Sequence, residues 1–137
     1  MVASQAQAGS TILVVDDSST IRRSAEIFLT QAGYAVVLAE DGFEALSQII
    51  AHLPALIFCD VLMPRLDGFQ TCSLIRQSHQ FHTIPVVMLS SKDGLFDRAR
   101  GVLAGANAYL TKPFTKDSLL KTVRDQLQSL TKLPQIS

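Results

Sequence analysis

The 137-residue chain has no tryptophan, only two cysteines and no surplus of charge, because 12 acidic residues balance 12 basic ones. A chain of balanced charge lacks the broad electropositive surface that holds nucleic acid or an anionic membrane. It also lacks any apolar run near the roughly 20 residues of a membrane span, and residues 1–7 have neither the basic start nor the apolar core of a signal peptide. We therefore expect a cytoplasmic protein that binds neither nucleic acid nor membrane.

Metal-binding and redox motifs built from cysteine and histidine are also missing. Cys59 and Cys72 fall in separate predicted elements, a strand and a helix, without CxxC spacing. His52, His79 and His82 do not pair at the spacing of metal ligands. We interpret the two thiols as free core residues and the three imidazoles as surface or loop groups.

What the chain does have is a regular alternation of short apolar runs and helical patterns. The apolar runs predict strands at residues 11–15, 34–39, 56–60, 85–89 and 107–110. Apolar residues at helical spacing after each run predict five helices. This alternation predicts one doubly wound α/β domain with a five-stranded parallel sheet in the order 2-1-3-4-5. We expect the domain to span residues 11–130, with flexible tails at 1–10 and 131–137.

Acidic residues end the first and third predicted strands, which lie side by side where the strand order reverses. Asp16 and Asp17 follow the first strand and Asp60 ends the third, so we expect three carboxylates in one shallow cleft. Their mutual repulsion favours a bound cation, and ligands that are all oxygen select a hard ion, here magnesium. In the alternative interpretation, Asp16 and Asp17 only cap the next helix. Asp60, together with Lys112 beyond the fifth strand, favours the metal site.

A lysine, a hydroxyl and three carboxylates suit acyl-phosphate chemistry. Lys112 would balance the charge of a phosphoryl group, and Ser90, at the end of the fourth strand, would supply the hydroxyl. Asp60 follows a central and fully apolar strand, so it would lie deepest of the three acids. We predict that Asp60 is the nucleophile that takes the phosphoryl group.

One ordered set of residues follows the predicted strands: Asp16-Asp17, Asp60 with Met63-Pro64 and Asp67-Gly68, Ser90, Tyr109, and Lys112-Pro113-Phe114. This set resembles the response regulator receiver domains of two-component signalling, and the chain is CheY-like in being a lone domain. The resemblance covers roughly residues 10–130. It implies that a histidine kinase phosphorylates Asp60 and that magnesium is held by Asp16, Asp17, Asp60 and the backbone carbonyl of Leu62.

The resemblance also implies how a signal would leave the site. The hydroxyl of Ser90 would move toward the phosphoryl group, and the ring of Tyr109 would turn into the space released. Periodicity alone favours a simpler role for Tyr109, that of a half-buried strand aromatic. The implied output face, where an effector protein reads the change, consists of the fourth helix, the fifth strand and the last helix. The resemblance further implies a cis peptide between Lys112 and Pro113, and we expect a monomer.

Two surface stretches, residues 17–23 and 89–97, resemble receivers of the PilG type, which serve type IV pilus twitching motility. At two positions this chain departs from the family: neither holds an amide or carboxylate side chain that could orient an attacking water. Leu62 lies two residues after Asp60, and Lys92 lies two residues after Ser90. We therefore predict slow loss of the phosphoryl group.

Three alternative functions differ in what they need from the sequence. The first is a chemotaxis-type regulator of another motility output. The second is a magnesium-dependent phosphohydrolase that forms an aspartyl phosphate, but such enzymes want a second acid where this chain has Leu62. The third is a fragment of a DNA-binding regulator, which the absence of a basic surplus and of a helix-turn-helix makes the weakest.

Some conspicuous residues have an ordinary structural interpretation. Arg22 and Arg23 could bind a phosphorylated partner, but an arginine pair on an amphipathic helix is usually a solvated face. Asp67 could add a metal ligand, although a helix cap followed by the turn residue Gly68 explains it more simply.

Overall fold

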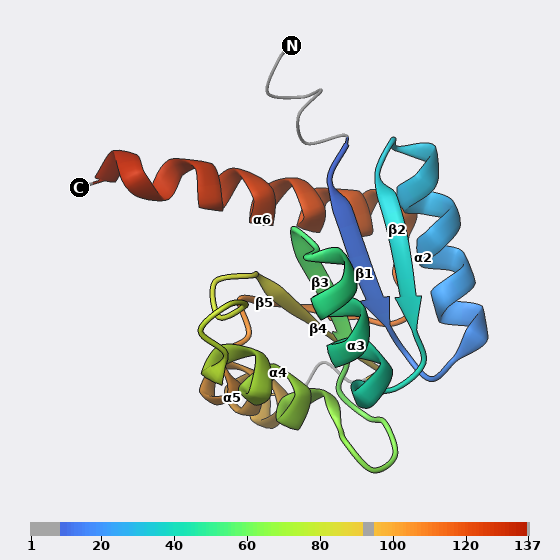
Figure 1. Cartoon of the computed structure of the whole chain (residues 1–137). Helices are drawn as coiled ribbons and strands as arrows, with labels where there is room; N and C mark the ends of the chain where they lie inside the picture. The colour runs from blue at the N-terminus through green and yellow to red at the C-terminus, as the bar shows by residue number, and fades with distance from the viewer. Residues whose placement is uncertain (1–8, 92–94, 137) are drawn as a thin grey trace.

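Five parallel strands form one sheet in the order β2-β1-β3-β4-β5, as predicted. This computed structural model describes residues 9–91 and 95–136. The strands are β1 (Thr11–Val15), β2 (Ala35–Ala39), β3 (Leu56–Asp60), β4 (Val86–Ser90) and β5 (Ala108–Thr111). The helices are α2 (Ser19–Gln31), α3 (Gly42–His52), α4 (Gly68–Gln77), α5 (Leu95–Ala104) and α6 (Lys116–Ile136) (Figure 1). In the described part of the chain, every helix is too short or too polar to cross a membrane.

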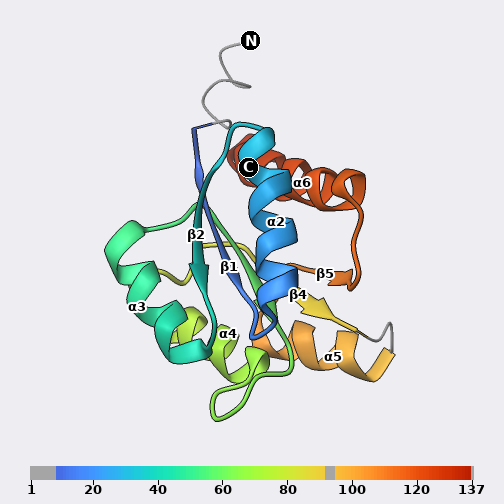
Figure 2. The same ribbon diagram turned by 90° about the vertical axis from the view of Figure 1, so that its right-hand side faces the viewer.

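The sheet is covered by helices on both faces, which is why the central strands β3 and β4 are apolar except for their last residues, Asp60 and Ser90. All five residues of β3 and all five of β4 are buried. One core cluster joins the sheet to α3, α4 and α5, and it includes Ile49, Cys72 and Met88. A second cluster joins the opposite face to α2 and α6 (Figures 1 and 2). Both cysteines are free and buried, as predicted.

Helix starts follow the capping residues in the sequence. The side chains of Ser18, Asp41 and Asp67 accept hydrogen bonds from backbone N–H groups in the first turns of α2, α3 and α4. Asp67 also forms a capping box with Gln70, which confirms the interpretation of Asp67 as a cap. Gly33 follows the end of α2 with φ of +96°, a conformation that favours glycine.

Several element boundaries differ from the prediction. β2 begins at 35 rather than 34, and β5 spans 108–111 rather than 107–110. The fourth strand begins at Val86 rather than at Pro85, because proline has no N–H to donate to a neighbouring strand. This shift brings Ser90 into β4 as its last residue. The last helix continues to Ile136, past the expected start of the tail at 131. Leu133 continues the three-residue spacing of Leu127 and Leu130, a helical pattern that the prediction stopped short of.

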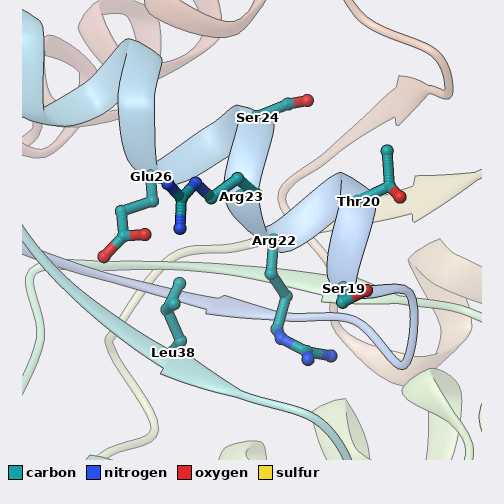
Figure 3. Close-up of a pocket in the computed structure, with 7 residues that line it drawn as sticks. All are labelled: Ser19, Thr20, Arg22, Arg23, Ser24, Glu26 and Leu38. Carbon is teal, nitrogen blue, oxygen red and sulfur yellow. The ribbon is translucent and has the colours of Figure 1, made fainter.

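The arginine pair of α2 consists of two side chains in different surroundings. Arg23 is exposed, as predicted, whereas Arg22 is half-buried. The Arg22 guanidinium donates to the backbone carbonyl of Asp16 and lies 4.0 Å from the Glu40 carboxylate. Figure 3 shows the two side chains diverging beside a surface hollow along α2 and β2. The prediction of a solvated pair is therefore wrong for Arg22, because α2 directs that side chain toward the carboxyl ends of β1 and β2.

The start of α4 packs directly against the end of β3. A Cβ atom built on Gly68 would lie 2.1 Å from the backbone oxygen of Asp60, so only glycine permits this approach. The Gly68 N–H donates to the carbonyl of Val61 at 3.1 Å. The position of α4 is thus tied to the strand end that carries Asp60.

We predict that Gly68→Ala lowers the free energy of unfolding by about 1–3 kcal/mol, because the added methyl group overpacks the end of β3. Gly101→Ala is the matched control, since a Cβ there meets the Met88 Cγ atom at an ordinary 3.6 Å. The control gains helix propensity and should be as stable as wild type or more so. Urea unfolding of both variants makes the comparison, and a Gly68→Ala protein of wild-type stability would contradict it.

Candidate functional site

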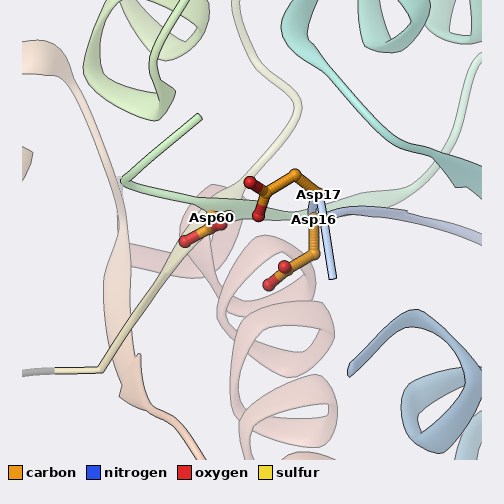
Figure 4. A group of neighbouring side chains, drawn as sticks. All are labelled: Asp16, Asp17 and Asp60. Carbon is orange, nitrogen blue, oxygen red and sulfur yellow. The ribbon is translucent and has the colours of Figure 1, made fainter. Parts of the chain in front are cut away.

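The three predicted acids converge at one edge of the sheet (Figure 4). Asp16, Asp17 and Asp60 each present a carboxylate oxygen, and these oxygens lie within 4.8 Å of one another. The sheet brings them together because β1 and β3 are neighbours with Val15 paired to Cys59, so the acids follow at the same level. Asp16 and Asp60 are buried, at 0% and 3% exposure, while Asp17 is exposed.

Lys112 reaches the cluster from beyond β5. Its Nζ atom lies 2.9 Å from Asp16 Oδ2 and 3.1 Å from Asp60 Oδ1. These acids precede the lysine by 96 and 52 residues, so the contact depends on the whole sheet. The Lys112 N–H donates to the Ser90 carbonyl at 2.7 Å, which extends the pairing of β4 with β5. The Lys112–Pro113 peptide is cis, as the family resemblance implied.

Backbone N–H groups hold the two buried carboxylates. The N–H of Ser18 donates to Asp16 Oδ1 at 2.9 Å, and the N–H of Leu62 donates to Asp60 Oδ1 at 3.3 Å. The sequence patterns did not predict these contacts or the Arg22 contact with the Asp16 carbonyl. For Arg22, the available signal was its position four residues after the cap Ser18, where a helical side chain lies above the cap.

The electrostatics of the cluster are unbalanced. Burial, followed by the nearby charge of Asp16, raises the pKa of Asp60 from 3.8 to about 6, although Lys112 acts in the opposite direction. Burial by itself would lower the pKa of Lys112, but its hydrogen bonds and charge interactions with Asp16 and Asp60 raise it. Three carboxylates therefore share one ammonium group.

This donor set fits a divalent cation. The three residues offer only oxygen ligands, and two of them are buried carboxylates with one lysine between them. Hard cations such as magnesium take such ligands, and a second positive charge would offset the remaining repulsion. The predicted metal residues Asp16, Asp17 and Asp60 thus lie in one cluster.

Ser90 and Tyr109 lie on the face of the sheet that packs against α3, α4 and α5. Ser90 is buried at 2% exposure, and Tyr109 is half-buried. In the pairing of β4 with β5, Met88 is the partner of Tyr109 and Ser90 is the partner of Thr111. Because alternate residues of a strand share a face, Ser90 and Met88 point the same way, and Tyr109 packs in the Met88 cluster. Tyr109 and Ser90 are therefore diagonal neighbours.

The Leu62 side chain projects away from the protein at 78% exposure. It offers neither an amide nor a carboxylate beside Asp60. The second departure, Lys92, lies outside the described residues.

Comparison with known proteins places these residues in context. Residues 12–124 match the family described as the response regulator receiver domain, inside the predicted span of 11–130. Protein PilG of Pseudomonas aeruginosa is 50% identical over 129 residues, which are 94% of this chain and 96% of that protein. Response regulator MprA of Mycolicibacterium vanbaalenii is 41% identical over 120 residues, which are 88% of this chain but 51% of that protein. The solved structure of Vibrio cholerae chemotaxis protein CheY4 has a TM-score of 0.82 at 35% identity, over 85% of this chain and 98% of that chain.

We predict that Asp60→Asn stabilises the metal-free protein at neutral pH. The pKa of Asp60 is higher in the folded state, at about 6, than its ordinary 3.8. Between these values the folded state holds a proton that the unfolded state has released, so the wild type loses stability as the pH rises from about 4 to 6. Above about pH 6 the full loss of stability is present. The size of the pKa shift corresponds to a loss of up to about 3 kcal/mol in the free energy of unfolding.

Thermal unfolding in EDTA at pH 7.5 and pH 3.5 measures this effect. The variant should be more stable than wild type at pH 7.5, and the difference should disappear at pH 3.5. Asp17→Asn, which changes an exposed carboxylate, should alter stability little at either pH. A wild type as stable as Asp60→Asn at pH 7.5 would refute the cost assigned to the buried acid.

Proposed function

Since the chain belongs to the response regulator receiver domain family, we propose that it accepts a phosphoryl group on Asp60 from a histidine kinase and then changes its binding to an effector protein. The observation that carries this proposal is the position of the Lys112 ammonium, within 3.1 Å of both Asp16 and Asp60. A buried carboxylate beside a fixed positive charge and two further acids is arranged to receive a phosphoryl group.

In the transfer, an Asp60 carboxylate oxygen attacks the phosphorus of the kinase phosphohistidine. The phosphorus–nitrogen bond breaks as the phosphorus–oxygen bond forms, and the departing imidazole keeps the electron pair and takes up a proton. Lys112 pairs with the negative oxygens of the phosphoryl group, and the hydroxyl of Ser90 donates a hydrogen bond to it. The Leu62 N–H donates to Asp60 in the unphosphorylated protein. After transfer it would donate a hydrogen bond to a phosphoryl oxygen instead.

Magnesium would be held by Asp16, Asp17, Asp60 and the backbone carbonyl of Leu62. When bound, it would neutralise charge that spreads over the phosphoryl oxygens. The protein would act on no external substrate and would catalyse only its own phosphorylation and slow dephosphorylation.

The signal would pass through Ser90 and Tyr109 to the surface of α5, β5 and α6. Phosphorylation would shift a two-state equilibrium in which the hydroxyl of Ser90 and the ring of Tyr109 move together. Their diagonal placement on one face of the sheet supports this coupling. The identity of 50% with PilG supports an output in type IV pilus twitching motility. We propose that the chain acts in the cytoplasm as a monomer.

We predict that acetyl phosphate with magnesium adds one phosphoryl group to the wild type and none to Asp60→Asn. Intact mass spectrometry detects the added mass, and omission of magnesium should greatly reduce it. Phosphorylation that persists in Asp60→Asn would assign the nucleophile to another residue. Sustained release of phosphate from an external phosphomonoester would favour the phosphohydrolase instead.

We also predict that Leu62→Gln shortens the lifetime of the phosphorylated protein by at least about tenfold, because its amide could orient an attacking water. The exposed Leu62 side chain can be replaced without disturbing the core. Leu103→Gln, an equally polar change at 87% exposure on α5, is the control and should keep the wild-type lifetime. A wild-type half-life of only seconds would contradict the proposed role of Leu62.

A further inference from the structure

Two arginines of α5 each lie over an aromatic ring. The Arg98 guanidinium carbon is 4.9 Å from the centre of the Tyr109 ring, and that of Arg100 is 4.3 Å from the centre of the Phe69 ring. A guanidinium within about 6 Å of a ring centre is attracted to the ring. The two contacts have the same chemistry, but only one involves the ring proposed to move on phosphorylation.

Tyr109 lies at the rim of a hollow of about 170 Å³ between α5 and β5. Arg98, Gly101 and Asn107 also line this hollow. One side of the Tyr109 ring therefore faces the α5 surface under Arg98, and the strand pairing brings the residue next to Met88 and diagonal to Ser90. We therefore expect a ring that turns toward Ser90 to move away from the Arg98 guanidinium.

The backbone next to Tyr109 is firmly tied at the start of β5. The Asn107 Oδ1 atom accepts hydrogen bonds from Arg76 Nη2 at 2.6 Å and from the Val86 N–H at 2.9 Å. Arg76 also donates through Nε to the Gly105 carbonyl at 2.8 Å. These contacts tie the loop between α5 and β5 to α4 and β4. We therefore expect a movement at this position to involve the Tyr109 side chain, which Arg98 contacts, more than the backbone.

We propose that Arg98 is a positioning residue that holds the Tyr109 ring in its resting place and so opposes the phosphorylated conformation. The inference rests on the proposed function, because it names a contact that stabilises the unphosphorylated state of the proposed two-state equilibrium. An exposed cation–ring contact shifts an equilibrium by about 2- to 5-fold. Loss of Arg98 should raise the population of the inward ring by this factor.

The test compares Arg98→Met with Arg100→Met, which removes the same charge from the same helix. The chain has two tyrosines and no tryptophan, so 3-fluorotyrosine labelling gives two resonances, and Tyr34→Phe assigns them. The effect of D₂O on the fluorine shift measures exposure of the ring. In Arg98→Met, exposure of Tyr109 should fall because the ring turns inward, and Arg100→Met should match the wild type. A rise in exposure would mean that Arg98 only covers the ring, and it would overturn the proposal, as would an equal effect of Arg100→Met.

A second measurement uses beryllofluoride with magnesium as a mimic of the phosphoryl group. If Arg98 stabilises the resting state, Arg98→Met should bind the mimic about 2- to 5-fold more tightly than the wild type, and Arg100→Met should bind it equally. Unchanged or weaker binding by Arg98→Met would overturn the inference. A wild type that does not bind the mimic would instead refute the proposed function, and lower exposure of Tyr109 in metal-free Arg98→Met would still support the positioning role.

Discussion

The ammonium group of Lys112, placed between the carboxylates of Asp16 and Asp60, is the interaction on which the rest of the site depends. It joins the carboxyl ends of β1 and β3 to the segment after β5, which are strand ends that only a complete sheet brings together. Burial of a charged group is costly unless it is paired. Pairing with the lysine offsets the cost of burying Asp16 and Asp60. The third acid, Asp17, is exposed.

The pairing is incomplete, and this is useful for the chemistry. Lys112 pairs with two of the three clustered carboxylates, so the cluster retains negative charge that a divalent cation would offset. The raised pKa of Asp60 measures the cost of this arrangement to the folded protein. The buried strands β3 and β4 and the close approach of Gly68 to Asp60 supply the rigid surroundings that keep the acids in place.

Much of the fold and site could be predicted because the relevant signals are local. Strand-length apolar runs, capping residues such as Ser18 and Asp67, and acids at strand ends follow from backbone geometry and period. The half-buried position of Arg22 could be predicted only in part, because its place four residues after the cap Ser18 is a local signal but its partners are not. Its partners are the Asp16 carbonyl and Glu40, and which side of α2 faces them depends on how the helix packs on the sheet. The length of α6 was underestimated because the prediction ended at Leu130, although Leu133 continues the spacing.

The sequence by itself determined the class of fold, the order of the elements and the residues at each strand end, since hydrophobic period and turn residues are properties of short segments. The meeting of the three acids followed from the predicted strand order, but tertiary structure alone decided the distances between side chains and the contacts that no local pattern shows. The contacts of Lys112 with Asp16 and Asp60 and the tie between Arg76 and Asn107 join residues far apart in the chain. The stacking of Arg98 on Tyr109 joins two different elements, α5 and β5. Such contacts depend on strand register and helix packing, which arise from the whole core rather than from any single segment.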